Sequence, residues 1–244
     1  MLDNVVRIAK EICCGKYPDA TVTFLAGSIV RGEGTPYSDL DLVVIFDELP
    51  NAYRESFYFQ DYPVEAFVHD PETLHYFIER ERVAGLCIMA QMVSEGIELP
   101  ETCALSQSLK EFAHSVISAQ PPELSEEDLR KARYNITNLI DDIRSPRSKE
   151  EAVASGTLLY ESLANCYLRI NNLWEAKGKT IPRKLKLADS EFCLRFCGGF
   201  QKLFAGGETE EVIALSEEIL EPIGGFLFEG HKLNAPPDNR KAFS

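Results

Sequence analysis

The feature that most limits the fold of this chain is a glycine-serine pair followed by two closely spaced aspartates, each next to a stretch with strand character. Gly27 and Ser28 follow the β-branched and aromatic run TVTFLA. Asp39 and Asp41 open the segment SDLDLVVIF, which is apolar on both faces beyond Asp41 and is typical of a central strand. The glycine-punctuated segment between them predicts a turn or a single helical turn. The chain must therefore build a sheet that carries both residue pairs.

The two residue pairs have complementary chemistry. Gly27 lets the backbone turn without a Cβ, and exposed N–H groups with the Ser28 hydroxyl at a helix start suit a phosphate. Asp39 and Asp41 lie two apart on a strand, so their carboxylates share a face and repel unless a cation lies between them. Such oxygen ligands suit magnesium, which also takes phosphate ligands. Each residue alone has a structural explanation, but the combination predicts metal-assisted phosphoryl chemistry.

The first part of the chain mixes helix and strand patterns around this motif. Apolar residues recur at helical spacing over residues 3–15, which predicts a helix. Residues 54–60 and 63–69 predict a hairpin or two adjacent strands, and the pattern becomes helical after Pro71. We therefore expect a mixed α/β (α+β) domain over residues 1–102.

From about residue 104 onward no segment has convincing strand character. Helices are expected near residues 104–118, 125–144, 150–177, 189–205 and 208–227. We therefore expect an all-α helical bundle domain over residues 103–233, followed by a loose tail over residues 234–244.

Charge is unevenly distributed along the 244 residues, which hold 25 Lys+Arg against 39 Asp+Glu, a net charge of −14. This balance disfavours nucleic acid as a partner, because phosphate backbones attract basic side chains. Residues 1–102 hold 7 basic and 18 acidic side chains. An acidic half can attract a cationic small molecule, although charge alone favours the simpler interpretation that surface acid maintains solubility.

Neither a membrane nor an oxidising compartment is indicated. No apolar run approaches the roughly 20 residues that span a bilayer, and Asp3, Lys10 and Glu11 interrupt the apolar N-terminal residues, so we expect no secretory signal and a cytoplasmic location. The seven cysteines form no CxxC pair, and Cys193 and Cys197 are interpreted as buried free thiols.

The segment GSIVRGEGTPYSDLDLVVI resembles the signature of the nucleotidyltransferase superfamily, a Gly-Ser pair, a following Gly and then Asp-x-Asp on the next strand. Its Arg-Gly and Ser-Asp-x-Asp-Leu details are similar to minimal nucleotidyltransferases and to the aminoglycoside and lincosamide nucleotidyltransferases. The resemblance implies a small mixed-sheet core followed by a helical domain, with a nucleoside triphosphate (NTP) and two Mg²⁺ ions at the active site. The sharp part covers about residues 24–46.

The resemblance also implies roles for individual residues. Catalysis and metal binding would rest on Asp39, Asp41 and Glu65, and nucleotide binding on Gly27, Ser28, Arg31 and Ser38. Glu65 is the best match to the superfamily's third carboxylate, because it shares a strand face with Phe67 and His69 while apolar residues take the other face. His69 is expected to line the site for the same reason. The alternative is a solvent-facing Glu65 on a hairpin, and Asp61 in the turn and Asp70 at a helix start are weaker candidates.

The helical half resembles the same family only at the level of pattern. Its dense basic cluster over residues 177–186 offers Lys179 and Arg183 as triphosphate ligands, although cations also end a long helix favourably. Some antibiotic-modifying relatives supply a general base from this domain, and Asp142 is the candidate here, with Glu161 second. Asp142 faces either water or an interdomain cleft, and water is favoured.

The sequence therefore predicts a magnesium-dependent transferase that moves a nucleoside monophosphate from an NTP to a hydroxyl of a small molecule, with a cationic, aminoglycoside-like antibiotic as a candidate acceptor. One alternative is an antitoxin-type enzyme that adenylylates a protein partner, although minimal members resemble the first domain alone. A second is a catalytically silent nucleotide-binding protein, which the intact acidic residues disfavour. A nucleic-acid polymerase is disfavoured by the acidic charge. A homodimer stays open.

Overall fold

The computed structural model describes residues 2–235, and its contacts divide the chain into two compact units after Pro122. The division comes later than the boundary expected at residues 102 and 103. Helix α5 (Ala104–Ser118) contacts α4 (Ile88–Glu95) and α3 (Pro71–Val83), so it belongs to the first unit. Within the described residues, no helix combines the length and apolarity that a membrane crossing needs.

The first unit is built on a mixed five-stranded sheet, as expected. Its strands are β1 (Val22–Ala26), β2 (Leu40–Ile45), β3 (Tyr53–Phe59), β4 (Tyr62–His69) and β5 (Ile97–Leu99), in the order β3-β4-β2-β1-β5. Strands β2 and β4 are parallel, and the other neighbours are antiparallel. The central position expected for β2 is confirmed. The short strand β5 was not expected, since it is defined by its pairing with β1 rather than by a sequence pattern of its own.

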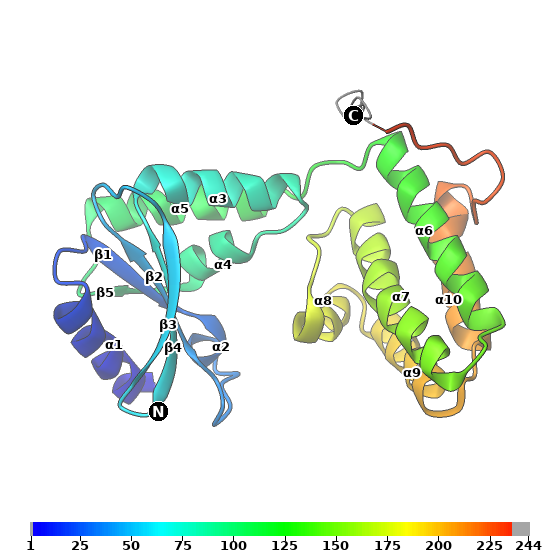
Figure 1. Ribbon diagram of the computed structural model, residues 1–244. Coiled ribbons are helices and arrows are strands. Elements are labelled where there is room, and N and C mark those ends of the chain that lie inside the picture. The colour runs from blue at the N-terminus through cyan, green and yellow to red at the C-terminus, as the bar shows by residue number, and fades with distance from the viewer. Residues whose placement is uncertain (1, 236–244) are drawn as a thin grey trace, which may run out of the picture. The chain divides into compact units, whose positions relative to one another are not determined.

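Helices cover both faces of this sheet (Figure 1). Helix α1 (Leu2–Lys16) buries Val5, Ile8 and Ile12 in a core that also contains Leu42 of β2 and Ala66 of β4. Helices α3 and α4 contact β4 and β1 from the other side. Because side chains alternate along a strand, the residues of β2 and β4 that do not face α1 face the side of α3 and α4.

The expected hairpin is present. Strands β3 and β4 are joined through Gln60 and Asp61, whose φ angles of 46° and 67° lie in the left-handed region that tight two-residue hairpin turns use. Asp70 then begins α3 as its N-cap, accepting a hydrogen bond from the Thr73 backbone N–H. Asp61 therefore lies in the turn and Asp70 at the helix start, as the sequence predicted.

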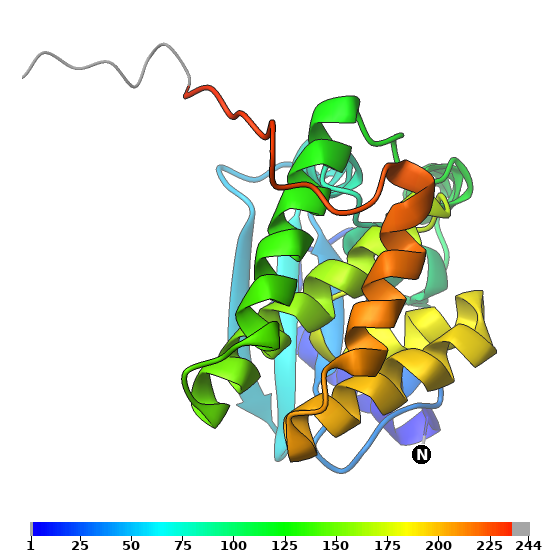
Figure 2. The same cartoon turned by 90° about the vertical axis from the view of Figure 1, so that its right-hand side faces the viewer.

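The second unit is helical, which confirms the expected fold class. It contains α6 (Glu126–Arg144), α7 (Lys149–Ile170), α8 (Ile181–Ala188), α9 (Ser190–Gly206) and α10 (Glu210–Leu220), with short 3₁₀ helices at Gly178–Thr180 and Glu221–Ile223. Figure 2 shows α6 and α10 running alongside each other. The core is rich in aromatic residues, with Phe192, Phe196 and Phe200 of α9 almost fully buried.

Two expected helices are shorter in the structure. The helix expected over residues 150–177 ends at Ile170, and Asn172 adopts a left-handed conformation that favours a helix end. The helix expected over residues 208–227 ends at Leu220, and the positive φ angles of Gly224 and Gly225 follow. Of the expected loose tail, residues 234 and 235 lack regular structure, and residues 236–244 lie outside the described part of the chain.

Candidate active site

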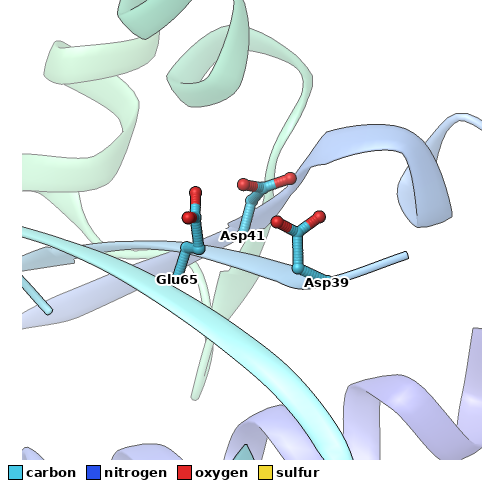
Figure 3. Close-up of side chains that lie close together, drawn as sticks. All are labelled: Asp39, Asp41 and Glu65. Atoms are coloured by element: carbon cyan, nitrogen blue, oxygen red, sulfur yellow. The ribbon is translucent and has the colours of Figure 1, made fainter. Parts of the chain in front are cut away.

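Three carboxylates from two neighbouring strands converge on one face of the sheet. In the parallel pair, Asp41 of β2 is the register partner of Glu65 of β4, and Asp39 lies just before β2. Each of the three side chains offers an oxygen within 4.8 Å of the oxygens offered by the other two (Figure 3). All three residues are half-buried. The structure therefore brings together the three acidic residues, here called the acidic triad, that the sequence singled out.

The direction of these side chains follows from what is buried on the opposite face. Leu40 and Leu42 of β2, and Val64 and Ala66 of β4, pack in the core that contains α1. Alternation along each strand then turns the intervening Asp41 and Glu65 away from α1. A shift of either strand by one residue would bury a carboxylate in this core, so hydrophobic burial sets the register that joins the two acids.

Gly27 is required by the close approach of Asp41. It is buried, begins the short helix α2 (Gly27–Val30) and has a φ of +84°, in the region that favours glycine. A Cβ built on Gly27 would lie 1.9 Å from Oδ2 and 2.8 Å from Cγ of Asp41. The absence of a side chain therefore makes room for the Asp41 carboxylate as well as allowing the turn.

Ser28 and Ser38 connect this turn to the segment that carries Asp39. The Ser28 hydroxyl donates to Ser38 Oγ at 3.2 Å, and Ser38 Oγ also accepts a hydrogen bond from the Thr35 backbone N–H at 2.8 Å. The two serines thus help to fix the loop that leads into Asp39. Arg31, the other expected nucleotide ligand, is exposed and pairs with Glu33 and Glu95 at 3.4 and 3.3 Å.

Arg54 is a residue of the site that the sequence analysis missed. It lies on β3, and its guanidinium donates to Oε1 of Glu65 and stands 4.9 Å from the centroid of the Phe67 ring. The hairpin register pairs Arg54 with Phe67 and Ser56 with Glu65, so Arg54 and Glu65 are diagonal neighbours on one face. A two-residue turn at residues 60 and 61, combined with strand alternation, is the signal that would have placed Arg54 there.

His69 shares the strand face of Glu65 but does not line the acidic triad. It lies four residues further along β4, roughly 13 Å away at about 3.3 Å per residue. Its buried ring contacts the ring of Phe77 on α3 edge to face, with centroids 5.3 Å apart. Burial lowers the pKa of His69, which favours the neutral ring. The expectation that His69 lines the site is therefore wrong, because β4 continues beyond the acidic triad and His69 lies at its far end.

The remaining candidates belong to the second unit. Lys179 lies in the 3₁₀ helix at Gly178–Thr180 and Arg183 in α8, and both are exposed. Asp142 is exposed on α6, where it lines a pocket with Asp141, Arg147 and other residues of that unit. Glu161 is exposed on α7. Their roles in nucleotide binding and proton transfer stay predictions.

Comparison with known proteins places these residues in a family context. Residues 6–91 match the family model of the nucleotidyltransferase domain, a range that contains the acidic triad and Gly27. Among solved structures, the chain is similar to the nucleotidyltransferase-like protein from Exiguobacterium sibiricum 255-15, with 15% sequence identity and a TM-score of 0.46 over 89% of this chain and 74% of that one. No curated protein matches the chain.

Proposed function

From the premise that this chain is a nucleotidyltransferase superfamily protein, with its nucleotidyltransferase domain at residues 6–91, we propose that it transfers a nucleoside monophosphate from an NTP to a hydroxyl of a small molecule. In this reaction the bond between the α- and β-phosphates breaks, a phosphoester forms with the acceptor oxygen, and pyrophosphate leaves. The observation that carries the proposal is the convergence of three carboxylates beside the Gly27 turn.

The donor set of the acidic triad fits a divalent metal ion. Three carboxylates whose oxygens lie within 4.8 Å of one another form an all-oxygen ligand set, and oxygen ligands suit Mg²⁺. Their mutual repulsion favours a cation between them. Asp39, Asp41 and Glu65 would hold the metal, with two ions expected from the family resemblance. When bound, Mg²⁺ would stabilise negative charge on the reacting phosphoryl group.

The other residues of the domain bind and orient the nucleotide in this proposal. Gly27 lets the backbone come close to a phosphate, and the Ser28 hydroxyl donates to it in place of Ser38. Arg31 and Ser38 add polar groups on the same loop. From the second unit, Lys179 and Arg183 are proposed as triphosphate ligands and Asp142 as the group that accepts the proton of the acceptor hydroxyl.

The family resemblance suggests a small cationic acceptor, and the charge of the first unit is compatible with it. The acidic excess of residues 1–102, with 18 acidic against 7 basic side chains, gives this part of the chain a negative potential that attracts cations. An aminoglycoside-like compound has this chemistry. The proposal predicts that amine-bearing polyols are better acceptors than neutral ones, and that added salt reduces this preference.

A transfer screen tests the proposal directly. The full chain is incubated with Mg²⁺ and each of the four α-³²P-labelled NTPs, with aminoglycosides, lincosamides and cell protein as separate acceptors. We expect the label to appear on a small molecule, and to be lost with Asp41→Asn. Label on protein would instead favour adenylylation of a partner, and no transfer to any acceptor class would contradict the proposed activity.

Nucleotide binding is expected to require a divalent metal. Without it, the phosphates of an NTP would meet the carboxylates of Asp39, Asp41 and Glu65 with like charge. Isothermal titration calorimetry with NTP should therefore show binding with Mg²⁺ or Mn²⁺ and weak or no binding with EDTA. Asp41→Asn is the control that should lose the metal dependence. Equal affinity with and without metal would rule out a metal-binding role for the triad.

Ser28→Ala is expected to weaken Mg²⁺–NTP binding about 10- to 150-fold. One hydrogen bond to a charged group contributes about 1.5–3 kcal/mol, and each 1.4 kcal/mol is a factor of ten. Ser38→Ala is the matched control, because it breaks the same hydroxyl pair but leaves the Ser28 hydroxyl in place. Calorimetry should show a larger loss for Ser28→Ala. Equal losses would contradict a distinct role of the Ser28 hydroxyl in binding the phosphate.

A further inference from the structure

Glu65 makes an ion pair with an arginine from the neighbouring strand. Arg54 of β3 donates through its Nη2 to Oε1 of Glu65, and the side chains of Arg54 and Glu65 are 56% and 26% exposed. The same guanidinium lies over the ring of Phe67, the next residue on that face of β4. Two contacts thus hold Arg54 at the triad, one with Glu65 and one with Phe67, which are neighbours on the same face of β4.

The acidic triad needs positive charge in the absence of metal. Asp39, Asp41 and Glu65 carry a formal charge of −3 when ionised and offer oxygens within 4.8 Å of one another. Like charges at this distance repel and favour side-chain conformations that separate them. The Arg54 guanidinium supplies one positive charge at the Glu65 corner of the triad, on a carboxylate that a metal ion would also use.

We propose that Arg54 is a positioning residue that serves as the resting counter-ion of the acidic triad, so that a metal ion must displace its guanidinium from Glu65. This inference rests on the proposed metal site and assigns the state of that site before metal arrives. Replacing a residue that only supports the metal site would weaken metal binding, whereas replacing a counter-ion has the opposite effect. Neutralising Arg54 should strengthen the binding of a free metal ion to the protein.

The expected size follows from Coulomb's law. A unit positive charge about 5 Å from a divalent ion at a solvent-exposed site opposes binding moderately, and salt screens part of this opposition. Loss of the Arg54 charge should therefore tighten free Mn²⁺ binding about five- to tenfold at low salt, and less at high salt. A purely structural role, through packing on Phe67, would leave Mn²⁺ affinity unchanged or weaken it.

The test measures Mn²⁺ binding to the full metal-free chain, without nucleotide, by calorimetry and by the electron paramagnetic resonance signal of free Mn²⁺. The variants are Arg54→Gln, Arg54→Met, which keeps an unbranched apolar stem over Phe67, and Arg54→Lys, which keeps the charge. Arg80→Gln is the matched control, because exposed Arg80 of α3 also lies over an aromatic ring, that of Phe77, and its loss changes the net charge equally. Asp41→Asn reports on the metal site itself.

We expect Arg54→Gln and Arg54→Met to bind Mn²⁺ about five- to tenfold more tightly, with Arg54→Lys and Arg80→Gln close to the wild type. Thermal melts should show that Mn²⁺ stabilises the two neutral variants more than the wild type. Unchanged or weaker Mn²⁺ binding in both neutral variants would overturn the inference, even if Asp41→Asn shows that the metal site exists. If Asp41→Asn leaves Mn²⁺ binding unaffected, the proposed metal site itself fails, and the role of Arg54 fails with it.

Discussion

Asp41→Asn and Glu65→Gln should each lower the rate of nucleotidyl transfer by about a thousandfold or more. Both substitutions keep the shape of the side chain but remove a negatively charged metal ligand from the acidic triad. Metal assistance contributes several kcal/mol of charge stabilisation, and about 4 kcal/mol corresponds to a factor of a thousand in rate. Single-turnover assays with excess enzyme measure this loss without interference from product release.

The double variant shows whether the two residues act together. Residues that serve one catalytic unit have non-additive effects, so Asp41→Asn/Glu65→Gln should lose little more than either single variant. Multiplied losses would mean that Glu65 has a separate role. Asp61→Asn is the control, because exposed Asp61 lies in the hairpin turn with a φ of 67°, a conformation that asparagine tolerates. It should transfer nucleotide at the wild-type rate.

The same variants should not destabilise the metal-free protein. Removing one carboxylate from the triad relieves repulsion, and the ion pair that Glu65 makes with half-exposed Arg54 contributes little to stability. The melting temperature of Asp41→Asn should be unchanged or raised. A large fall would place Asp41 in a structural hydrogen-bond network and would make loss of folding, rather than loss of a metal ligand, the cause of lost activity.

Gly27→Ala is the second substitution with a large expected effect, on the transfer rate and on stability together. The new Cβ would lie 1.9 Å from Oδ2 of Asp41, so the carboxylate or the turn must move. A displacement of about 1 Å in a catalytic group costs on the order of a hundredfold. The left-handed φ of 84° adds about 1–3 kcal/mol of backbone strain for a residue with a side chain.

Gly32→Ala separates these two costs. Gly32 has a φ of +73°, but a Cβ there meets nothing within 4 Å. Its substitution should therefore lower the free energy of unfolding, measured by denaturant titration, by only about 1 kcal/mol, and leave the rate of nucleotidyl transfer near the wild-type value. Gly27→Ala should destabilise more and lower that rate about a hundredfold. Similar transfer rates for the two variants would show that Asp41 does not depend on the space beside Gly27.

Local pattern was sufficient for most helices and strands of the first unit. The helical spacing of Val5, Ile8 and Ile12 predicted α1, and alternation around Glu65 predicted which residues of β4 face the core. These signals are local because each follows from the repeat of a helix or strand and from burial on one side. Segments whose structure depends on a distant partner, such as β5, left no such pattern.

The second unit shows where periodicity misleads. The apolar pattern across residues 150–177 predicted one helix, but the helix ends at Ile170, shortly before left-handed Asn172, and the next α-helix starts at Ile181. Arg169 pairs with Glu175, and Asn165 accepts a hydrogen bond from the Ala176 backbone N–H, so side chains of α7 hold the segment that follows. Such tertiary contacts override local helical preference.

The sequence by itself determined the chemistry of the candidate site, because Gly27, Ser28, Asp39 and Asp41 are close along the chain and their spacing fixes how they face. The family resemblance also singled out Glu65, but only the tertiary structure decided that Glu65 lies beside Asp41 and that Arg54 joins it. The parallel pairing of β2 with β4, set by burial of both strands in the core with α1, places Glu65 beside Asp41. The antiparallel pairing of β3 then places Arg54 on Glu65. Strand pairing joins residues that are distant in sequence, and its register is set by which side chains of both strands are buried together, so no single segment shows which residues will be neighbours.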